Sequence, residues 1–452
     1  MPTQTKTKQN GRRDFLKIAG ISAAGTLLST TAGNVPYVHA GENNTLNIAL
    51  VGCGGRGGGA LVNALNTEGP KKLIAMADVF PGKVTRLLQA ITEPYGDSID
   101  VPPDRQFSGF DCYRKAIDAV GSGGVVLLGT PPLFRPMEFE YAVEKGVHVF
   151  MEKSFGVDAP GVRRVLKAGK VADAKNLKVV TGLMSRHKVS LQHAIEQIHA
   201  GIIGDVMTCW AYRMHPPFGI QPRLPNESLV AHHIRNFNNF TWVSGSPMLD
   251  WLIHNLDVCC WAKGMYPVSA QGHWIRQFRT EKDQLRDLYA PEYTFPDGTR
   301  LFAQGRYIQG AWTCFQATIH GTTGCAVIGE GVHQPVIFKG HNPVSENLIW
   351  TYTGPPFRHE FQAEHDTLFD CIRKDKPHNE TERSCMSAMV GILGRMAAES
   401  GQVVSWDDAF NSTKELVPNV EQLTLDGPPP VEPDENGNYP FIMPGETAIT
   451  HP

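Results

Sequence analysis

The chain contains 452 residues, of which 41% are hydrophobic and 19% are charged, and its formal net charge at pH 7 is -3. This length and composition are typical of a globular protein with two or three domains. The nearly balanced charge argues against nucleic-acid binding, and the sequence has no long run of like charges that would indicate attachment to a membrane surface.

The first 40 residues are typical of an export signal. Arg12 and Arg13 precede a mildly apolar segment over 18–32, and the sequence "VHA" at 38–40 resembles a small-residue cleavage site. Paired arginines before such a segment resemble a Tat signal. We therefore predict a Tat-type signal over 1–40, the Tat export machinery as a partner, and a periplasmic or secreted location. The alternatives are a disordered basic N-terminus and a retained membrane anchor. No later stretch reaches the about 18 to 20 apolar residues of a membrane span.

A glycine-rich turn follows the first predicted strand, over 46–51. Gly52, Gly54 and Gly57 have the GxGxxG spacing, and apolar residues then recur with the period of a helix. In dinucleotide-binding domains the first glycine allows a tight turn and the second lets the backbone approach a pyrophosphate. The third packs the helix against the strand, with its N-terminus aimed at the phosphates. In so glycine-rich a region the spacing alone is a weak signal, so the strands that follow decide its meaning.

The second predicted strand ends at Asp78, 21 residues after Gly57. A carboxylate at this place suits the ribose 2′-hydroxyl of NAD and would repel the 2′-phosphate of NADP, so we expect NAD in preference to NADP. Arg56 lies in the glycine-rich turn, where it can reach a phosphate. The alternative role of Asp78 is structural, as a helix N-cap or a solvated strand end.

Two further strands complete the pattern. A buried run over 123–132 ends in the sequence "TPP", a helical pattern follows, and the strand over 147–153 ends in Glu152 and Lys153. Strands that alternate with helices predict a doubly wound parallel sheet, in which ligands bind beyond the carboxyl ends of the strands. The predicted cofactor-binding residues are Gly52, Gly54, Gly55, Arg56, Gly57, Asp78, Thr130, Pro131, Glu152 and Lys153.

These motifs, with "SPMLDWLIHNLD" at 246–257, resemble the Gfo/Idh/MocA family of oxidoreductases, and most closely its exported bacterial branch with Tat signals. The resemblance implies an α/β fold with an NAD(P)-binding Rossmann domain over 41–182. A C-terminal α/β domain over 183–416, with a large open, mostly antiparallel sheet, would bind substrate and form oligomers. The resemblance also implies a tightly bound dinucleotide, a carbohydrate or polyol substrate, and a homodimer or homotetramer. Residues 417–452 would form a Pro-rich C-terminal arm, which in this family can wrap a neighbouring subunit.

The sequence departs from the family pattern beside the predicted catalytic lysine. Ser154 follows Lys153 where the family usually has proline, which would restrict the backbone of the lysine. Arg135 stands where many relatives of this branch carry a histidine.

The candidate catalytic residues are Lys153, Asp250 and His254. Oxidation of a hydroxyl requires hydride loss from carbon and proton loss from oxygen, and the cofactor performs only the first. A lysine beside a positively charged nicotinamide, partly removed from water, can accept that proton, and His254 is the second proton handler. Asp250, four residues before His254 and therefore on the same helix face, would orient either group or bind sugar hydroxyls. The structural alternatives are pairing of Lys153 with Glu152 or a helix end, a core role for His254, and a cap or buried ion pair for Asp250.

Substrate binding is predicted for Asp250 and His254 together with Arg186, which lies where the family begins its second domain. The sequence gives no metal-binding pattern. Nine cysteines are scattered without a CxxC, and His232 and His233 are adjacent rather than four residues apart. We therefore predict no metal site.

The predicted function is that of a periplasmic NAD-dependent oxidoreductase acting on a sugar or polyol hydroxyl, with Lys153 and His254 handling the proton. One alternative is an NAD-dependent glycosidase that oxidises a sugar carbon transiently, eliminates the glycosidic bond and reduces the carbon again. A non-catalytic sugar-binding protein is a third alternative, and the presence of both Lys153 and His254 disfavours it.

Overall fold

The computed structural model of the protein describes residues 45–329 and 334–445. The predicted export signal over 1–40 lies outside these residues. From Thr45 onward the chain forms one compact unit. The helices of the described ranges include none that is long and apolar enough to cross a membrane.

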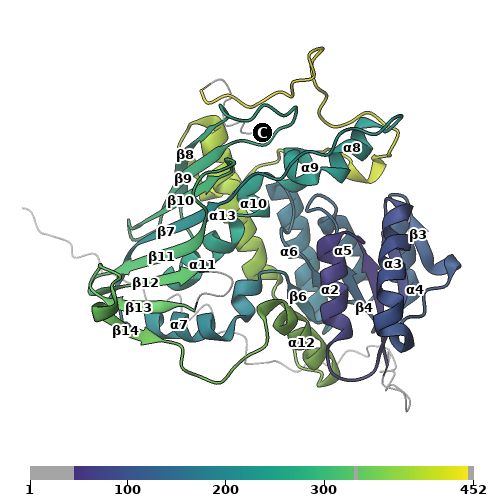
Figure 1. Cartoon of the computed structure of the whole chain (residues 1–452), viewed down its shortest axis with the longest axis horizontal. Coiled ribbons are helices and arrows are strands. Elements are labelled where there is room, and N and C mark those ends of the chain that lie inside the picture. The colour runs from purple at the N-terminus through teal and green to yellow at the C-terminus, as the bar shows by residue number, and fades with distance from the viewer. Residues whose placement is uncertain (1–44, 330–333, 446–452) are drawn as a thin grey trace, which may run out of the picture. The chain divides into compact units, whose positions relative to one another are not determined.

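The first part of the unit folds around a six-stranded sheet (Figure 1). Its strand order is β3-β2-β1-β4-β5-β6, and every neighbouring pair is parallel. The strands are β1 (Leu46–Val51), β2 (Lys71–Asp78), β3 (Gln106–Ser108), β4 (Val125–Leu128), β5 (His148–Met151) and β6 (Val179–Thr181). In this Rossmann order the winding reverses between β1 and β4, which leaves a ligand-binding crevice beyond their carboxyl ends. The predicted doubly wound sheet is confirmed.

Helices cover both faces of this sheet because its central strands are apolar on both sides; all four residues of β4, for example, are buried. The helices between the strands are α2 (Gly55–Leu65), α3 (Pro81–Tyr95), α4 (Cys112–Val120), α5 (Arg135–Glu144) and α6 (Ala159–Ala174). One more helix, α12 (Glu360–Arg373), comes from far along the chain and packs against α2, β5 and β6. The Rossmann part is therefore completed by a segment of the second half.

The second part is a nine-stranded sheet with the order β14-β13-β12-β11-β7-β10-β9-β8-β15. Only β7 and β10 run parallel among its described neighbours; the other pairs are antiparallel. The predicted large, mostly antiparallel sheet is thus confirmed. Its strands are β7 (Val206–Met214), β8 (Ser269–Ile275), β9 (Leu288–Thr294), β10 (Arg300–Arg306), β11 (Cys314–Gly321), β12 (Gly324–Gly329), β13 (Val336–Lys339), β14 (Leu348–Thr351) and β15 (Val404–Ser405).

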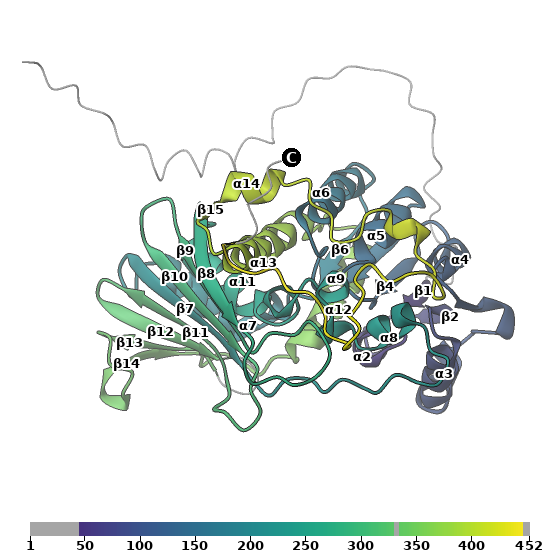
Figure 2. The same cartoon turned by 90° about the horizontal axis from the view of Figure 1, so that it is seen from above.

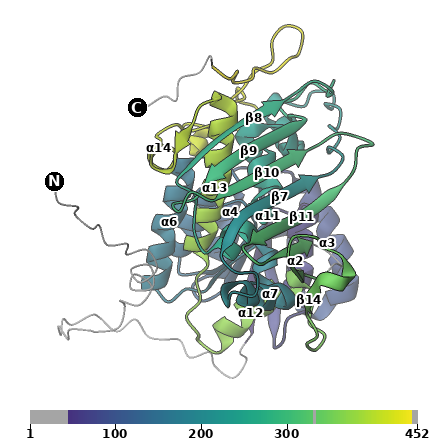
Figure 3. The same cartoon turned by 90° about the vertical axis from the view of Figure 1, so that its left-hand side faces the viewer.

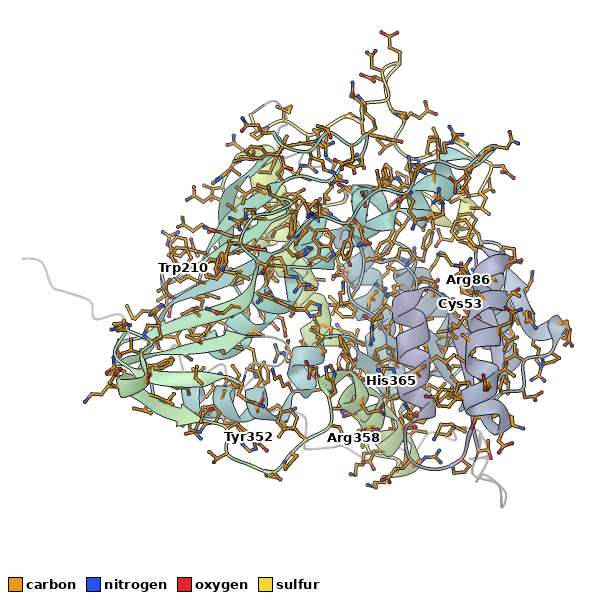
Figure 4. All side chains as sticks on the ribbon, in the orientation of Figure 1. Cys53, Arg86, Trp210, Tyr352, Arg358 and His365 are labelled. Atoms are coloured by element: carbon orange, nitrogen blue, oxygen red, sulfur yellow. The ribbon has the colours of Figure 1, made fainter. Side chains whose placement is uncertain are left out.

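One face of the second sheet is covered and the other is open. α11 (Ile253–Lys263) and α13 (Thr381–Ser400) pack on the inner face, and α7 (Val189–His199) packs against α11. Along β9 and β10 fully buried residues alternate with less buried ones, as expected for a half-covered sheet. Figure 3 shows the strands in front of α11 and α13, and Trp210, labelled in Figure 4, stacks on Phe302 of this open face at 4.5 Å.

Three short helices follow one another along the chain between β7 and β8. They are α8 (Leu229–Arg235), α9 (Thr241–Ser244) and α10 (Pro247–Asp250), while α14 (Trp406–Asn411) follows β15. Single 3₁₀ turns occur at Gly96–Ser98, Pro103–Arg105, Met184–His187, Phe237–Asn239, Ser345–Asn347 and Val420–Gln422.

The C-terminal arm lies along its own chain (Figure 2). The ring of Tyr439 is buried, and its hydroxyl is hydrogen-bonded to Nε2 of His233 at 2.6 Å. Nearer its start, the carbonyl of Leu425 accepts a hydrogen bond from the Ser228 hydroxyl. The arm therefore packs over the segment that contains α8, and contact with a neighbouring subunit stays a prediction.

Candidate functional site

The glycine-rich turn after β1 forms a cradle at the start of α2. Gly52 has a φ of +92°, and a Cβ there would lie 2.6 Å from the carbonyl carbon of Gly129. A Cβ at Gly57 would lie 1.9 Å from the carbonyl oxygen of Gly52, so close packing requires glycine at both positions. A Cβ at Gly54 would meet nothing within 4 Å, and no side chain caps α2 at this residue. The uncapped N–H groups of this helix start are suited to bind a phosphate.

A cavity of about 690 Å³ extends from this cradle along the carboxyl ends of the strands. Its volume is in the range of small-molecule and cofactor sites. Nine of the ten predicted cofactor-binding residues line it: Gly52, Gly54, Gly55, Arg56, Asp78, Thr130, Pro131, Glu152 and Lys153. The tenth, Gly57, packs α2 against the turn instead.

Asp78 occupies the end of β2 on the wall of this cavity. Its Oδ2 accepts a hydrogen bond from the backbone N–H of Cys53 at 2.8 Å, and its Oδ1 accepts one from Phe80 at 2.9 Å. The carboxylate therefore ties the turn after β1 to the turn after β2. An ionised carboxylate has about four acceptor positions, so capacity remains for a ligand hydroxyl. The structural role and the predicted ribose-binding role are compatible.

A segment of the second half closes the opposite wall of the cavity. This cover segment, residues 221–237, includes α8 and contributes Gln221, Leu224, Glu227, Ile234, Arg235 and Phe237 to the lining. Arg235 donates from Nε and Nη2 to the two carboxylate oxygens of Glu227, each at 2.7 Å, and this paired donation lowers the pKa of Glu227 to about 2. The two ends of the segment are also joined, because Asn236 Oδ1 accepts from the N–H of Gln221 at 2.7 Å. An ion pair and a hydrogen bond within the cover segment thus hold its two ends together.

Lys153 and Asp250 form an ion pair on the cavity wall. Lys153 Nζ donates to Asp250 Oδ1 at 2.6 Å and also to the main-chain carbonyl of Asp250. The two side chains are only 18% and 7% exposed. Of the structural alternatives, pairing with a helix end is observed, because Asp250 is the last residue of α10 and its carbonyl accepts from Lys153. Pairing with Glu152 is not observed, because the Glu152 carboxylate accepts from Arg56. The pair holds a potential proton donor in a fixed direction at the edge of the cavity.

Asp250 and His254 lie on different helices, so the prediction that they share one helix face is wrong. α10 ends at Asp250 and α11 begins at Ile253. The Asp250 carbonyl accepts from Lys153, and the chain turns at Trp251, whose ring packs against Tyr307 at 4.5 Å. The four-residue spacing of Asp250 and His254 therefore does not place their side chains on one helix face, because the helix is interrupted between them.

His254 is buried, with 6% of its surface exposed. Burial holds its pKa well below the usual value, and the positive charges of Lys153, Arg213 and Arg56 act in the same direction. Its Nδ1 is buried without a hydrogen-bond partner among the described residues. His254 does not line the 690 Å³ cavity itself. At neutral pH it is an uncharged imidazole close enough to Lys153 to feel its charge.

Arg56 links the glycine turn to a strand end and to α12. Its Nε donates to Glu152, its guanidinium lies 4.2 Å from the ring centre of Phe361, and its Nη2 lies 3.7 Å from Glu364. Glu364 is fully buried, and both its carboxyl oxygens lack hydrogen-bond partners among the described residues. Burial raises the pKa of Glu364 well above its usual value, and the charge of Glu152 adds to this shift. Arg56 is thus engaged by protein groups but remains on the cavity wall.

The known proteins compared with this chain below are oxidoreductases. No protein-family model matches the chain. An inositol 2-dehydrogenase of Ralstonia nicotianae is 24% identical over 243 residues, which make up 54% of this chain and 62% of that protein. A second one, of Burkholderia lata, is 25% identical over 244 residues, again 62% of its length. The chain therefore spans less than two thirds of the length of these curated relatives.

Solved structures match over a larger share. The aldose-aldose oxidoreductase of Caulobacter crescentus, complexed with glycerol, has a TM-score of 0.63 at 19% identity, covering 80% of this chain and 99% of that one. A scyllo-inositol dehydrogenase of Lactobacillus casei, with bound NAD(H) and scyllo-inositol, has a TM-score of 0.59 at 20% identity and the same coverage. The chain has the fold of these oxidoreductases. At such identities the likeness establishes the fold alone.

Arg186 is engaged elsewhere within this oxidoreductase fold. It donates to the Asp257 carboxylate from Nε at 2.7 Å and from Nη2 at 2.8 Å, and its guanidinium lies 4.3 Å from the ring centre of Trp261. It is not among the residues that line the cavity. The structure thus does not bring Arg186 together with Lys153 and Asp250, and substrate binding by this residue stays a prediction.

The sequence analysis did not assign roles to two buried charged residues of α5. Arg135 and Glu138 are 2% and 3% exposed. The Thr130 hydroxyl donates to Glu138 at 2.5 Å, while Arg135 donates to the carbonyls of Thr130 and Ser154. Burial raises the pKa of Glu138 to about 7 and lowers that of Arg135 to about 10. Their three-residue spacing, which places them on one helix face, was the available signal.

Two basic side chains beside Asp78 were also missed. Lys83 and Arg86 of α3 line the cavity, and Arg86, labelled in Figure 4, also lines a neighbouring groove with Cys53. Their positive charges lie near the predicted ribose site. The signal was again a three-residue spacing, on the helix that directly follows the strand end.

Proposed function

We propose that the protein is an oxidoreductase that uses a nicotinamide dinucleotide to oxidise or reduce a carbon bearing a hydroxyl group in a sugar or polyol. The observation that carries the proposal is a single cavity that joins the cradle at Gly54 to the Lys153–Asp250 pair. The fold shared with inositol dehydrogenases supports it, as does the NAD(H) bound to the scyllo-inositol dehydrogenase of that fold.

The residues present fit NAD(H). The cradle at Gly54 would hold the pyrophosphate against the start of α2, and the remaining acceptor positions of Asp78 would take ribose hydroxyls. Asp78 would repel the 2′-phosphate of NADP, while Lys83 and Arg86 would attract it, and we propose NAD as the main cofactor. When bound, NAD⁺ accepts the hydride from the carbon that is oxidised.

Lys153 would handle the proton at Nζ. Asp250 Oδ1 fixes the direction of Nζ, so that an N–H can donate to a carbonyl oxygen in reduction and the amine can take the hydroxyl proton in oxidation. General acid–base catalysis by a positioned group contributes about 10²- to 10⁴-fold. We propose His254, uncharged at neutral pH, as the second proton handler. Because it does not line the cavity in this structure, contact with a substrate hydroxyl would require a rearrangement of the cavity wall.

The surroundings of Asp250 suit a substrate with both C–H faces and hydroxyls. Trp251 follows Asp250 directly and packs against His215 at 4.5 Å and Phe218 at 5.2 Å. The Phe218 side chain is exposed. Apolar and aromatic walls with a few fixed polar groups are typical of small-molecule sites.

We also propose Tat export to the periplasm, with the dinucleotide retained through export. The twin arginines support the export, and the cover segment, which lines the nucleotide cavity, supports the retention. We further propose a homodimer or homotetramer formed through the open face of the second sheet.

Cofactor analysis and substrate turnover test the proposal together. The purified full chain should release NAD or NADH on denaturation, and the apo protein should bind added NADH with quenching of its tryptophan fluorescence. A panel of inositols, aldoses and alditols should then change the 340 nm absorbance of the bound cofactor. A protein that neither contains nor binds a dinucleotide would refute the proposed function.

A second candidate is redox-neutral glycoside cleavage, which the cover segment on the cavity wall favours because such a reaction needs no cofactor exchange. It proceeds by oxidation of a sugar carbon to a ketone, elimination of the aglycone to leave a double bond, addition of water to that double bond, and return of the hydride to the ketone. Incubation with nitrophenyl glycosides in the absence of added cofactor separates the two candidates. Stoichiometric NADH without nitrophenol indicates the dehydrogenase, whereas continuous nitrophenol release without net NADH indicates the glycosidase.

A further inference from the structure

We propose that Arg135 and Ser154 are positioning residues that aim Lys153, because they hold the turn after β5 against α5 on one side and α10 on the other. This role rests on the proposed function, because the direction in which Lys153 Nζ points matters for catalysis only if Lys153 handles the proton. Ser154 is not among the residues that line the cavity, whereas Arg135 is, and we propose that both act through Lys153.

On the side of α5, one guanidinium spans two strand ends. Arg135 Nη1 donates to the carbonyl oxygen of Ser154 at 2.5 Å, and Nη2 donates to the carbonyl of Thr130. The turn after β4 and the turn after β5 are thereby joined through a planar, rigid fork. With a pKa of about 10, Arg135 stays charged at neutral pH, and Glu152 and Asp250 supply compensating negative charge.

On the side of α10, two consecutive residues of the turn bond to two consecutive residues of the helix. Ser154 is fully buried, and its hydroxyl donates to the carbonyl of Leu249 at 2.6 Å. Lys153 makes the neighbouring bond, to Asp250 at 2.6 Å. The residues before α10 are held in turn, because Arg395 of α13 donates to the Gly245 carbonyl at 2.8 Å.

These contacts fix Lys153 at both ends. Asp250 holds the tip of a flexible four-carbon side chain, while Ser154 and Arg135 hold the backbone from which it extends. Tip contact alone does not fix where Nζ lies relative to the cavity, because the turn could rotate with the pair. A misplacement of about 1 Å can lower a rate by about 10²-fold.

Ser154→Ala and Arg135→Met test this role in the full chain. We expect kcat to fall about 10- to 100-fold in both variants, while KM for substrate and Kd for NADH stay within about threefold of the wild type. Ser400→Ala and Arg163→Met are matched controls. Ser400 donates to the Met396 carbonyl at 2.7 Å, and Arg163 donates to two carbonyls, one of them that of Ser412 at 3.0 Å. Both controls should keep the wild-type kcat.

Chemical labelling of Lys153 gives a second measurement that needs neither cofactor nor turnover. Acetic anhydride labelling followed by mass spectrometry reports the reactivity of Nζ in the apo protein. We expect labelling of Lys153 to be at least about fivefold faster in Ser154→Ala and Arg135→Met than in the wild type, since the Asp250 pair forms less often. In the controls the labelling rate should not change.

The outcomes separate this role from the proposed function. Suppose that the wild type has no oxidoreductase activity but Lys153 is labelled faster in the two variants than in the wild type. This result would refute the proposed function and support the positioning of Lys153. Wild-type kcat and labelling in Ser154→Ala would overturn the positioning even in an active enzyme. If Arg135→Met fails to fold, as judged by circular dichroism, Arg135→Lys replaces it. A lysine reaches one of the two carbonyls only, so an intermediate kcat and labelling rate are expected, and wild-type values would count against the proposal.

Discussion

Replacement of Gly54 by alanine tests the phosphate cradle with little disturbance of the fold. The backbone at Gly54 has φ -77° and ψ -177°, which other residues adopt readily, and the added Cβ meets no protein atom within 4 Å. We therefore expect the free energy of unfolding to stay within about 0.5 kcal/mol of the wild type. The methyl group would instead occupy space that a bound pyrophosphate needs.

The expected loss is one of binding. A pyrophosphate pushed away from the start of α2 loses at least one charge-assisted hydrogen bond, which contributes about 1.5–3 kcal/mol. Because about 1.4 kcal/mol corresponds to tenfold, the Kd for NADH should rise about 10- to 150-fold. Titration of the apo protein, followed by tryptophan fluorescence, measures Kd, and urea unfolding measures stability.

Alanine variants of two other glycines serve as comparisons for Gly54→Ala. Gly96 also has open space at Cβ, and its φ of -41° and ψ of -49° suit alanine, but it lies outside the cavity, so Gly96→Ala should change neither quantity. Gly57→Ala places a Cβ 1.9 Å from the Gly52 carbonyl and should lower stability by about 1–3 kcal/mol. A wild-type Kd for Gly54→Ala, or a stability loss as large as that of Gly57→Ala, would refute the cradle.

Three more predictions concern side chains of the cavity. Lys153→Ala should lower kcat at least about 100-fold in steady-state kinetics without changing the NADH titration; an unaltered kcat would exclude Lys153 as the proton handler. Folding raises the pKa of Glu138 from 4.5 to about 7, so the folded state binds the carboxyl proton of Glu138 more tightly than the unfolded state does. The free energy of unfolding of the wild type should therefore fall by about 3 kcal/mol as the pH rises from 4.5 to 7. Glu138→Gln should abolish that loss in urea unfolding between pH 5 and 8, and an unchanged slope would contradict the shift. Glu227→Ala removes the carboxylate that binds Arg235 and should speed NADH dissociation in stopped flow about tenfold, whereas the exposed Glu435→Ala should not; equal rates would show that the cover segment does not retain the cofactor.

The nucleotide part of the site could be predicted because it depends on local pattern. The carboxyl ends of parallel strands meet at one edge of a sheet, so residues that follow separate strands, such as Gly52, Asp78, Thr130 and Lys153, converge without knowledge of any long-range contact. Each strand was recognisable from its own apolar run. The same logic predicted the order of elements in the Rossmann part, whereas the open second sheet was predicted only from the family resemblance.

The rest of the site depends on contacts between distant segments. Lys153 and Asp250 are 97 residues apart, and the backbone contact of Lys153 with Asp250 overrides the helical spacing that suggested a shared face with His254. The cover segment and the buried carboxyl of Glu364 enter the site from other parts of the chain in the same way. Such contacts between distant residues cannot be predicted from spacing in the sequence, because each contact depends on how the two sheets pack together.

The walls of the cavity come from both parts of the unit, and this bears on when a cofactor enters. Residues 52–153 supply the strand ends, while residues 221–250 supply the cover segment and Asp250, so the enclosed site exists only after the two parts have folded together. A protein exported in the folded state could carry its dinucleotide from the cytoplasm, where dinucleotide is abundant. A retained cofactor then allows one net oxidation per enzyme unless a second substrate returns the hydride, so steady-state kcat is measured with such a second, oxidised substrate present. Addition of a single polyol to the purified protein should therefore reduce one equivalent of bound NAD and stop, whereas a redox-neutral cycle would continue with the cofactor oxidised.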